Sequence, residues 1–114
     1  MTSDELQQQG YLRACDAAKV PEMMPLKLTL ADRAVLVCRS LGQVWAVDEM
    51  CPHKRESMAY GVVHEGQIIC PHHQYAFDLD TGRTTMRRCP PATVYPAQLA
   101  DDDQSVWILL PGAP

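Results

Sequence analysis

The sequence predicts an all-β fold built from short antiparallel strands. Apolar residues recur with a period of two, as at Leu26, Leu28 and Leu30, and this spacing places side chains on one face of a strand. Polar turns separate such runs at short intervals. The nine prolines also argue against long helices, because proline blocks a helix interior. We therefore expect a meander of short strands with only short helical turns.

The expected elements follow from apolar runs bounded by turn-forming residues. Strands are expected at residues 26–30, 35–38, 44–47, 67–70, 75–79, 93–99 and 105–110. The last two should pair with each other, because only the acidic turn at residues 101–104 separates them. Helical turns are expected at residues 17–20, with Asp16 as the cap, and at residues 55–59.

Length and composition favour a single globular domain over residues 1–114. A chain of this size can bury one core, and 46% hydrophobic with 21% charged residues is ordinary for a globular protein. No apolar run approaches the roughly 18 residues needed to cross a bilayer. The first ten residues are polar and acidic, unlike a secretory signal, so we expect a soluble protein of the cytoplasm.

The charge balance excludes nucleic acid as an expected partner. The formal charge is −4 and the pI is about 5.4, whereas phosphate binding needs a surplus of Lys and Arg on one face. Acidic residues such as Asp101, Asp102 and Asp103 instead suggest steering toward a basic surface on another protein.

Four metal-binding residue types stand in two short motifs between residues 51 and 73. The first is Cys51-x-His53, and after a gap of sixteen residues the second is Cys70-x-x-His73. Such a set could hold Zn²⁺ or an iron–sulfur cluster. Common zinc fingers group their cysteines on one element and their histidines on another, whereas each motif here carries one of each. One Cys and one His per loop is typical of a two-iron cluster in which one iron takes both thiolates and the other both imidazoles.

These motifs resemble the Rieske family, whose signature is C-x-H, a gap of about sixteen residues, and C-x-x-H. Proline follows each cysteine, at Pro52 and Pro71, and the stretches at residues 77–82 and 94–96 resemble later strands of the family. The resemblance implies one [2Fe–2S] cluster per chain. Its implied ligands are Cys51, His53, Cys70 and His73.

The resemblance also implies the Rieske architecture of antiparallel sheets. In that architecture a small cluster-binding subdomain, here about residues 48–86, is inserted in a basal β-barrel or sandwich formed by residues 1–47 and 87–114. The two imidazoles are expected at the exposed tip of the subdomain. Residues expected to ring them are Met50, Pro52, Met58, Pro71 and Tyr75.

High-potential members of the family carry an additional cysteine in each loop, joined as a disulfide, and a Ser and a Tyr that hydrogen-bond to the cluster sulfurs. Glu56 and His72 stand at the matching cysteine positions, and Tyr75 and Phe77 at the matching Ser and Tyr positions. Fewer hydrogen bonds to sulfur stabilise the reduced state less. The potential is therefore expected toward the low end of the Rieske range of roughly −150 to +300 mV.

Several further Cys and His residues need an interpretation. His72 offers the C-x-H spacing from Cys70, but the family pattern favours His73, so we interpret His72 as an exposed residue or one beside the ligands. His64 is expected on the surface. Core packing is the preferred interpretation for Cys38, whereas Cys89 lies in a loop that could line the cluster. Cys15 has no assigned role.

The resemblance implies a ferredoxin with no catalysis of its own. It would carry single electrons from a flavin-dependent reductase to the terminal oxygenase of a multicomponent, aromatic-ring oxygenase. The alternative is the small Rieske subunit of an NADH-dependent nitrite reductase, bound to the large subunit, because residues 51–54 and 77–79 also resemble that group. A zinc-binding interaction module is a third hypothesis, and it would give colourless protein.

Overall fold

The computed structural model describes residues 1–52, 55–72, 74–85 and 89–111. The elements in these ranges are short strands with one short α-helix and one 3-10 helix, η1. In chain order they are α1 (Ser3–Gln8), β1 (Leu12–Asp16), η1 (Ala17–Lys19), β2 (Leu26–Leu30), β3 (Arg33–Ser40), β4 (Gln43–Asp48), β5 (Val62–His64), β6 (Gln67–Ile69), β7 (Ala76–Asp78), β8 (Val94–Tyr95), β9 (Ala97–Leu99) and β10 (Ser105–Ile108). The predicted all-β class is confirmed.

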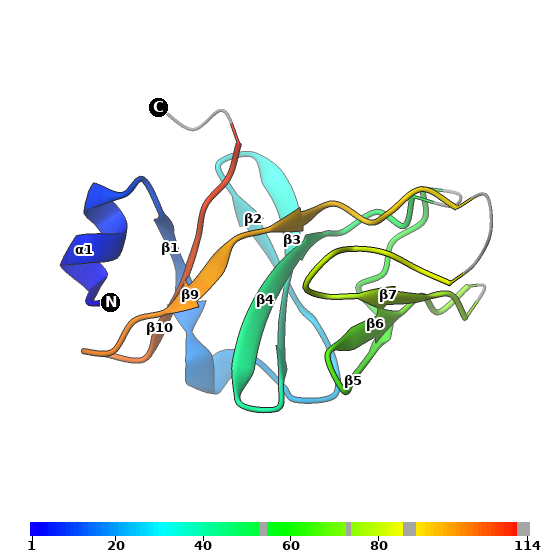
Figure 1. The fold of residues 1–114 in the computed structure, drawn as a ribbon, viewed down its shortest axis with the longest axis horizontal. Helices are drawn as coiled ribbons and strands as arrows, with labels where there is room; N and C mark the ends of the chain where they lie inside the picture. Colours follow the sequence, from blue (N-terminus) through cyan, green and yellow to red (C-terminus); the bar gives the residue numbers. More distant parts are fainter. Residues whose placement is uncertain (53–54, 73, 86–88, 112–114) are drawn as a thin grey trace.

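The strands within the described ranges form antiparallel sheets with the orders β2-β3-β4-β8, β1-β10-β9 and β5-β6-β7. Figure 1 shows the β2-β3-β4-β8 sheet in the middle of the molecule. Helix α1 and the β1-β10-β9 sheet lie at one end, and the β5-β6-β7 sheet lies at the other. The last of these sheets follows Cys51 in the chain, and Cys70 comes directly after its strand β6.

Tight two-residue turns set the registers of the first hairpins. Leu30 pairs with Arg33 across the β2–β3 turn, in which Ala31 and Asp32 have φ of 50° and 65°. The β3–β4 turn repeats this conformation at residues 41–42. Two consecutive residues with positive φ give the turn whose twist matches antiparallel strands. The predicted strands at 26–30, 35–38 and 44–47 are therefore confirmed, the last two as parts of longer strands.

The β2-β3-β4-β8 sheet separates two apolar cores because alternate residues of β3 point to opposite faces. Leu36 and Cys38 face one side, and Val35 and Val37 the other. The loop-side core consists of the buried residues Leu36, Cys38, Val47, Cys51, Met58, Val63, Ile68, Cys70, Phe77, Leu79 and Ala92. The basal core consists of Cys15, Ala17, Val20, Val35, Val37, Ala46, Tyr95, Val106, Ile108 and Leu110.

The strand predicted at residues 93–99 is wrong as one element, because it breaks at Pro96. Strand β8 pairs with β4, whereas β9 pairs with β10, so the chain changes sheets at the proline. Proline has no N–H to donate to a ladder and fixes its own φ, which suits such a change of direction. The predicted pairing with residues 105–110 is confirmed for β9 only.

One of the two predicted helical turns is confirmed and the other is wrong. The turn at residues 17–20 is confirmed as η1, but Asp16 makes no side-chain cap and instead its carboxylate contacts Arg13. The turn predicted at residues 55–59 is wrong, because Ser57 there forms an antiparallel bridge with Met50. Pairing between distant residues overrides local helix propensity at this position.

Helix α1 was not among the predicted elements. Thr2 and Glu5 form a capping box, in which the Glu5 amide donates to Thr2 Oγ1 at 3.3 Å and the Thr2 amide donates to Glu5 Oε1 at 3.0 Å. Leu6 is fully buried beside Ala100 and Trp107, which docks the helix. Among the described residues, no helix has the length and apolar character needed to cross a membrane.

Candidate metal centre

Two of the four predicted ligands lie in the described residues, and the structure brings them into the same core. Cys51 follows β4 and Cys70 directly follows β6, and both belong to the loop-side core. Both side chains are buried and both thiols are free of disulfides. His53 and His73 lie outside the described residues, so the complete ligand set stays a prediction.

The first cysteine loop, from Cys51 to Glu56, is closed by two backbone hydrogen bonds. The Cys51 amide donates to the Glu56 carbonyl at 2.7 Å, and the Arg55 amide donates to the Cys51 carbonyl at 2.6 Å. Arg55 has a φ of 54°, in the left-handed region. The Met50–Ser57 bridge continues the pairing outside the loop. The backbone therefore holds the start and the end of this loop together.

The second cysteine loop, from Cys70 to Tyr75, repeats this arrangement. The Cys70 amide donates to the Tyr75 carbonyl at 2.8 Å, and the Gln74 amide donates to the Cys70 carbonyl at 2.9 Å. Gln74 has a φ of 59°, matching the left-handed residue of the first loop. Each loop thus begins at a buried cysteine, turns back through a left-handed residue at the fifth position, and pairs its first residue with its sixth.

The first loop is fastened to the central sheet through Glu49. The Ser57 hydroxyl donates to Glu49 Oε2 at 2.7 Å, and Lys27 Nζ on β2 lies 3.0 Å from the same oxygen. The Ser57 hydrogen bond, followed by Lys27, holds the pKa of the Glu49 carboxyl below its ordinary value. A buried carboxylate is stable only with such partners. The exit of the first loop is therefore held by charge and hydrogen bonding.

The second loop is held by strands and a turn. Ile68 on β6 pairs with Phe77 on β7, and both side chains are fully buried. After β7, the Asp78 carbonyl accepts from the Gly82 amide at 2.7 Å, and the Gly82 carbonyl accepts from the Ala92 amide at 2.7 Å. A Cβ at Gly82 would lie 2.0 Å from the Ala92 carbonyl oxygen. Glycine therefore permits the close approach that brings the later chain beside this core.

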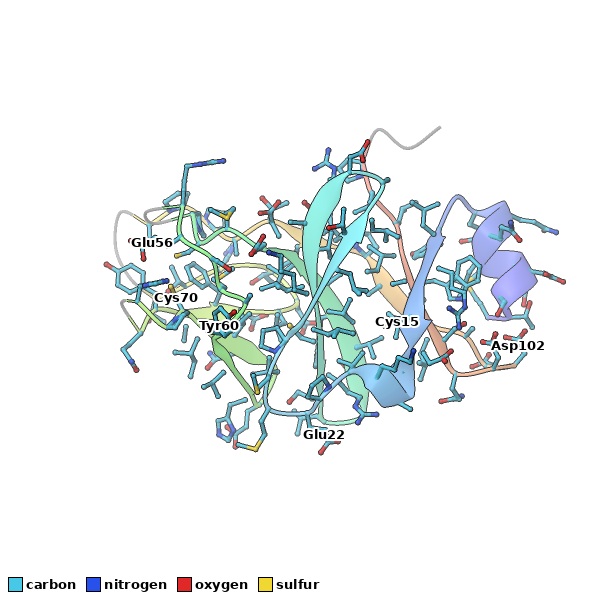
Figure 2. All side chains as sticks on the ribbon, turned by 180° about the vertical axis from the view of Figure 1, so that it is seen from behind. Cys15, Glu22, Glu56, Tyr60, Cys70 and Asp102 are labelled. Carbon is cyan, nitrogen blue, oxygen red and sulfur yellow. The ribbon has the colours of Figure 1, made fainter. Side chains whose placement is uncertain are left out.

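One contact joins side chains of the two loops. His72 Nδ1 lies 2.8 Å from Glu56 Oε2, and both side chains are partly exposed. Figure 2 places Glu56 near Cys70 at one end of the molecule, with Asp102 at the opposite end. The prediction that His72 lies exposed or beside the ligands is confirmed for its exposure, and its partner was missed. The acidic turn expected to steer partners lies far from the cysteine loops.

The remaining cysteines and His64 have distinct surroundings. His64 is exposed, as expected, and its Nε2 lies 3.7 Å from Oε1 of the neighbouring Glu65. Cys38 packs in the loop-side core, where burial raises the pKa of its thiol to about 12. Cys15 packs in the basal core, and burial raises its thiol pKa as well. Cys89 is half-buried against the loop-side core, near Cys70.

The expected ring of residues around the imidazoles is corrected at one member. Met58 is fully buried in the loop-side core, so it cannot form part of an exposed tip. Its amide donates to the Glu49 carbonyl at 2.8 Å, which draws it inward behind the first loop. Met50, Pro52 and Tyr75 are half-buried and Pro71 is exposed.

The donor chemistry of the described residues fits an iron–sulfur cluster. Each loop presents one thiol that is free of a disulfide to the same apolar core. A thiolate is costly in such surroundings unless a metal ion binds it, and thiolates are the protein ligands of iron–sulfur clusters. Two equivalent loops that each supply one sulfur suit a cluster shared between them.

Residues 10–98 match the family model of the Rieske [2Fe-2S] domain. The chain belongs to this family. The ferredoxin component of a naphthalene 1,2-dioxygenase system from Pseudomonas aeruginosa is 31% identical over 93 residues, which cover 78% of this chain and 86% of that protein. The Rieske fold and one [2Fe–2S] cluster per chain follow from this membership.

Solved structures share the fold. The Sphingomonas yanoikuyae B1 ferredoxin superposes with a TM-score of 0.77 at 29% identity, covering 89% of this chain and 99% of that one. A structure named for the small subunit of an NADH-dependent nitrite reductase from Mycobacterium tuberculosis has a TM-score of 0.76 at 23% identity. It covers 86% of this chain and 92% of that one, and this likeness concerns the fold alone.

Proposed function

We propose that this Rieske protein is the ferredoxin component of a multicomponent, aromatic-ring oxygenase. It passes single electrons from a flavin-dependent reductase to the terminal oxygenase and catalyses no reaction of its own. The similarity to a naphthalene 1,2-dioxygenase ferredoxin covers most of both chains, which supports the same electron-carrying role. The observation that carries the proposal is the presence of two buried, disulfide-free cysteines on two equivalently closed loops.

The proposed ligands of the cluster are Cys51, His53, Cys70 and His73. When bound, the cluster supplies a site that gains and loses one electron. The residues around the two cysteines keep that site apolar, and the closure of each loop limits how far the sulfur atoms can move. A fixed, dry site needs little reorganisation when its charge changes, which favours rapid electron transfer.

Strand β7, which follows the second loop, supports the expectation of a low potential. Phe77 is fully buried in the loop-side core and has no hydroxyl, and it stands at the family position where high-potential members carry the hydrogen-bonding Tyr. A hydrogen bond to sulfur stabilises the added negative charge of the reduced state. Without that donor, the potential is proposed to fall toward the lower end of the Rieske range.

Optical and magnetic spectra of the purified chain test the cofactor. The oxidised protein should be coloured, contain equal amounts of iron and acid-labile sulfide, and give an electron paramagnetic resonance signal after reduction with dithionite. Colourless protein with tightly bound zinc and no iron would overturn the proposal. Reconstitution with a flavin-dependent reductase and an aromatic-ring oxygenase then tests the role. Substrate turnover should depend on the concentration of this chain.

The nitrite reductase subunit remains the alternative, favoured by the similar stretches at residues 51–54 and 77–79. The two functions differ in how the protein associates. A ferredoxin should purify alone and exchange between partners, whereas a fixed subunit should copurify with a large subunit that carries sirohaem. The cytoplasmic location and the division into a cluster-binding subdomain at about 48–86 and a basal part stay predictions.

A further inference from the structure

Glu56 and His72 occupy corresponding edges of the two cysteine loops. The Glu56 carbonyl accepts the hydrogen bond from the Cys51 amide that closes the first loop, so its backbone is fixed relative to that cysteine. His72 lies two residues after Cys70, inside the second loop. The 2.8 Å contact between Glu56 Oε2 and His72 Nδ1 therefore connects two segments that are each anchored at a buried cysteine.

The surroundings of this pair leave it accessible to water. The exposed fractions are 48% for the His72 side chain and 39% for the Glu56 side chain. Water competes with such a contact, so its strength is that of a surface interaction. Its effect on the loops comes from its position, because it links parts of the chain that are far apart in the sequence.

We propose that Glu56 and His72 are positioning residues that fasten the two cysteine loops to each other and so slow the loss of the cluster. The inference rests on the proposed cluster site between these loops. A carboxylate oxygen can accept a hydrogen bond from an imidazole Nδ1–H, which suits the observed Glu56 Oε2–His72 Nδ1 contact. Neither side chain is proposed to touch iron or sulfide.

The test measures how fast the holoprotein loses its cluster in the presence of an iron chelator, followed by the visible absorbance. Glu56→Ala and His72→Ala should each increase the rate constant about two- to fivefold, the range that an exposed ion pair supports. Because both substitutions remove the same contact, the double variant should lose its cluster no faster than the more affected single variant. Glu56→Gln keeps an oxygen acceptor and should restore most of the wild-type retention.

Glu65→Ala is the matched control. Glu65 contacts His64 at 3.7 Å, and these side chains are 74% and 67% exposed, but both residues lie in the single hairpin formed by β5 and β6. This variant removes a similar surface contact without separating the cysteine loops. Its rate of cluster loss should equal that of the wild type.

The outcomes separate this inference from the function on which it rests. If the wild-type chain takes up no iron or sulfide, the proposed function fails and the fastening fails with it. If the wild type holds its cluster but Glu56→Ala retains it equally well, only the fastening is wrong. Additive effects in the double variant, or no recovery with Glu56→Gln, would also overturn the fastening.

Discussion

The two cysteine loops share a backbone design but differ in how the rest of the molecule holds them. Each closes with the same pair of hydrogen bonds around its cysteine, although the predicted histidine follows Cys51 by two residues and Cys70 by three. Glu49 fastens the first loop through Lys27 and Ser57, whereas paired strands frame the second. The closing backbone hydrogen bonds and the left-handed residue therefore set the conformation of each loop. The contacts that hold a loop in the molecule can be charged side chains or paired strands.

The largest expected effect comes from removing either buried cysteine. Cys51→Ala and Cys70→Ala should each abolish cluster binding, because each loop supplies one of the proposed thiolate ligands. Iron and sulfide analysis of the purified variants checks this result. Cys15→Ala, in the basal core, is the control and should keep a full complement of iron. Substantial iron in only one of the two loop variants would break the equivalence of the loops.

A smaller effect is expected at Gly61, which lies after the first loop and packs against the backbone just before the second loop. A Cβ at Gly61 would lie 2.4 Å from the Ile69 carbonyl oxygen, directly before Cys70. Gly61→Ala should therefore lower the free energy of unfolding by about 3 kcal/mol through overpacking against backbone. Urea unfolding measures this loss.

Gly42→Ala provides the comparison for the overpacking effect. Gly42 has a φ of 74°, but a Cβ added there would have no neighbouring atom within 4 Å, so only backbone strain of about 1 kcal/mol is expected. Equal losses of stability in Gly61→Ala and Gly42→Ala would show that the close approach of Gly61 to the Ile69 carbonyl is unimportant.

Acid should weaken the support of the first loop through Glu49. Because folding lowers the pKa of this carboxyl from 4.5, its stabilising contribution is present above that value and is lost as the pH falls through the folded pKa. Glu49→Gln should therefore be less stable than the wild type by about 1 kcal/mol at neutral pH, with the difference shrinking in acid. Urea midpoints across this pH range measure it.

Lys27→Gln sharpens the same test, since it leaves the stronger Ser57 hydrogen bond in place. Compared with the wild type, Lys27→Gln should lose only part of the stability that Glu49→Gln loses at neutral pH. A gap between the wild type and Glu49→Gln that stays constant as the pH falls would contradict the assigned role of the ionised carboxylate.

The smallest effect concerns the left-handed residues of the two loops. Arg55→Gly and Gln74→Gly should each raise the free energy of unfolding by about 0.5–1 kcal/mol, because glycine avoids the side-chain strain at positive φ and loses part of that gain to entropy. Thermal unfolding of both variants measures the change. Gln74→Ala should give no gain in stability. Unequal gains for Arg55→Gly and Gln74→Gly would show that the strain at positive φ differs between the two loops.

Sequence patterns predicted the central strands and placed each of the two cysteines in a loop after a strand, because these signals are local or follow a simple period. Alternation at residues 26–30 and the turns after them define β2 and β3, whereas the burial of both cysteines was not predicted and comes from the structure. The capping-box pair Thr2 and Glu5 was also readable, and it would have indicated α1.

Features that depend on distant contacts escaped prediction. Residues 55–59 have a composition compatible with a helix, but Ser57 pairs with Met50 instead. The burial of Met58 and the contact between Glu56 and His72 depend on how separate loops come together, which no local pattern encodes. Pro96 was a visible warning that the strand at 93–99 would break, but not that its halves would join different sheets.

Strand β3 contributes to both hydrophobic cores, with Leu36 and Cys38 on one face and Val35 and Val37 on the other. A peptide containing only the two cysteine loops would lack β3 and would expose the apolar residues that pack against Leu36 and Cys38. Melting of either core also removes a face from the other, so heat should unfold the protein in a single cooperative transition. The end of the molecule that holds the two cysteine loops is thus thermodynamically coupled to the basal core.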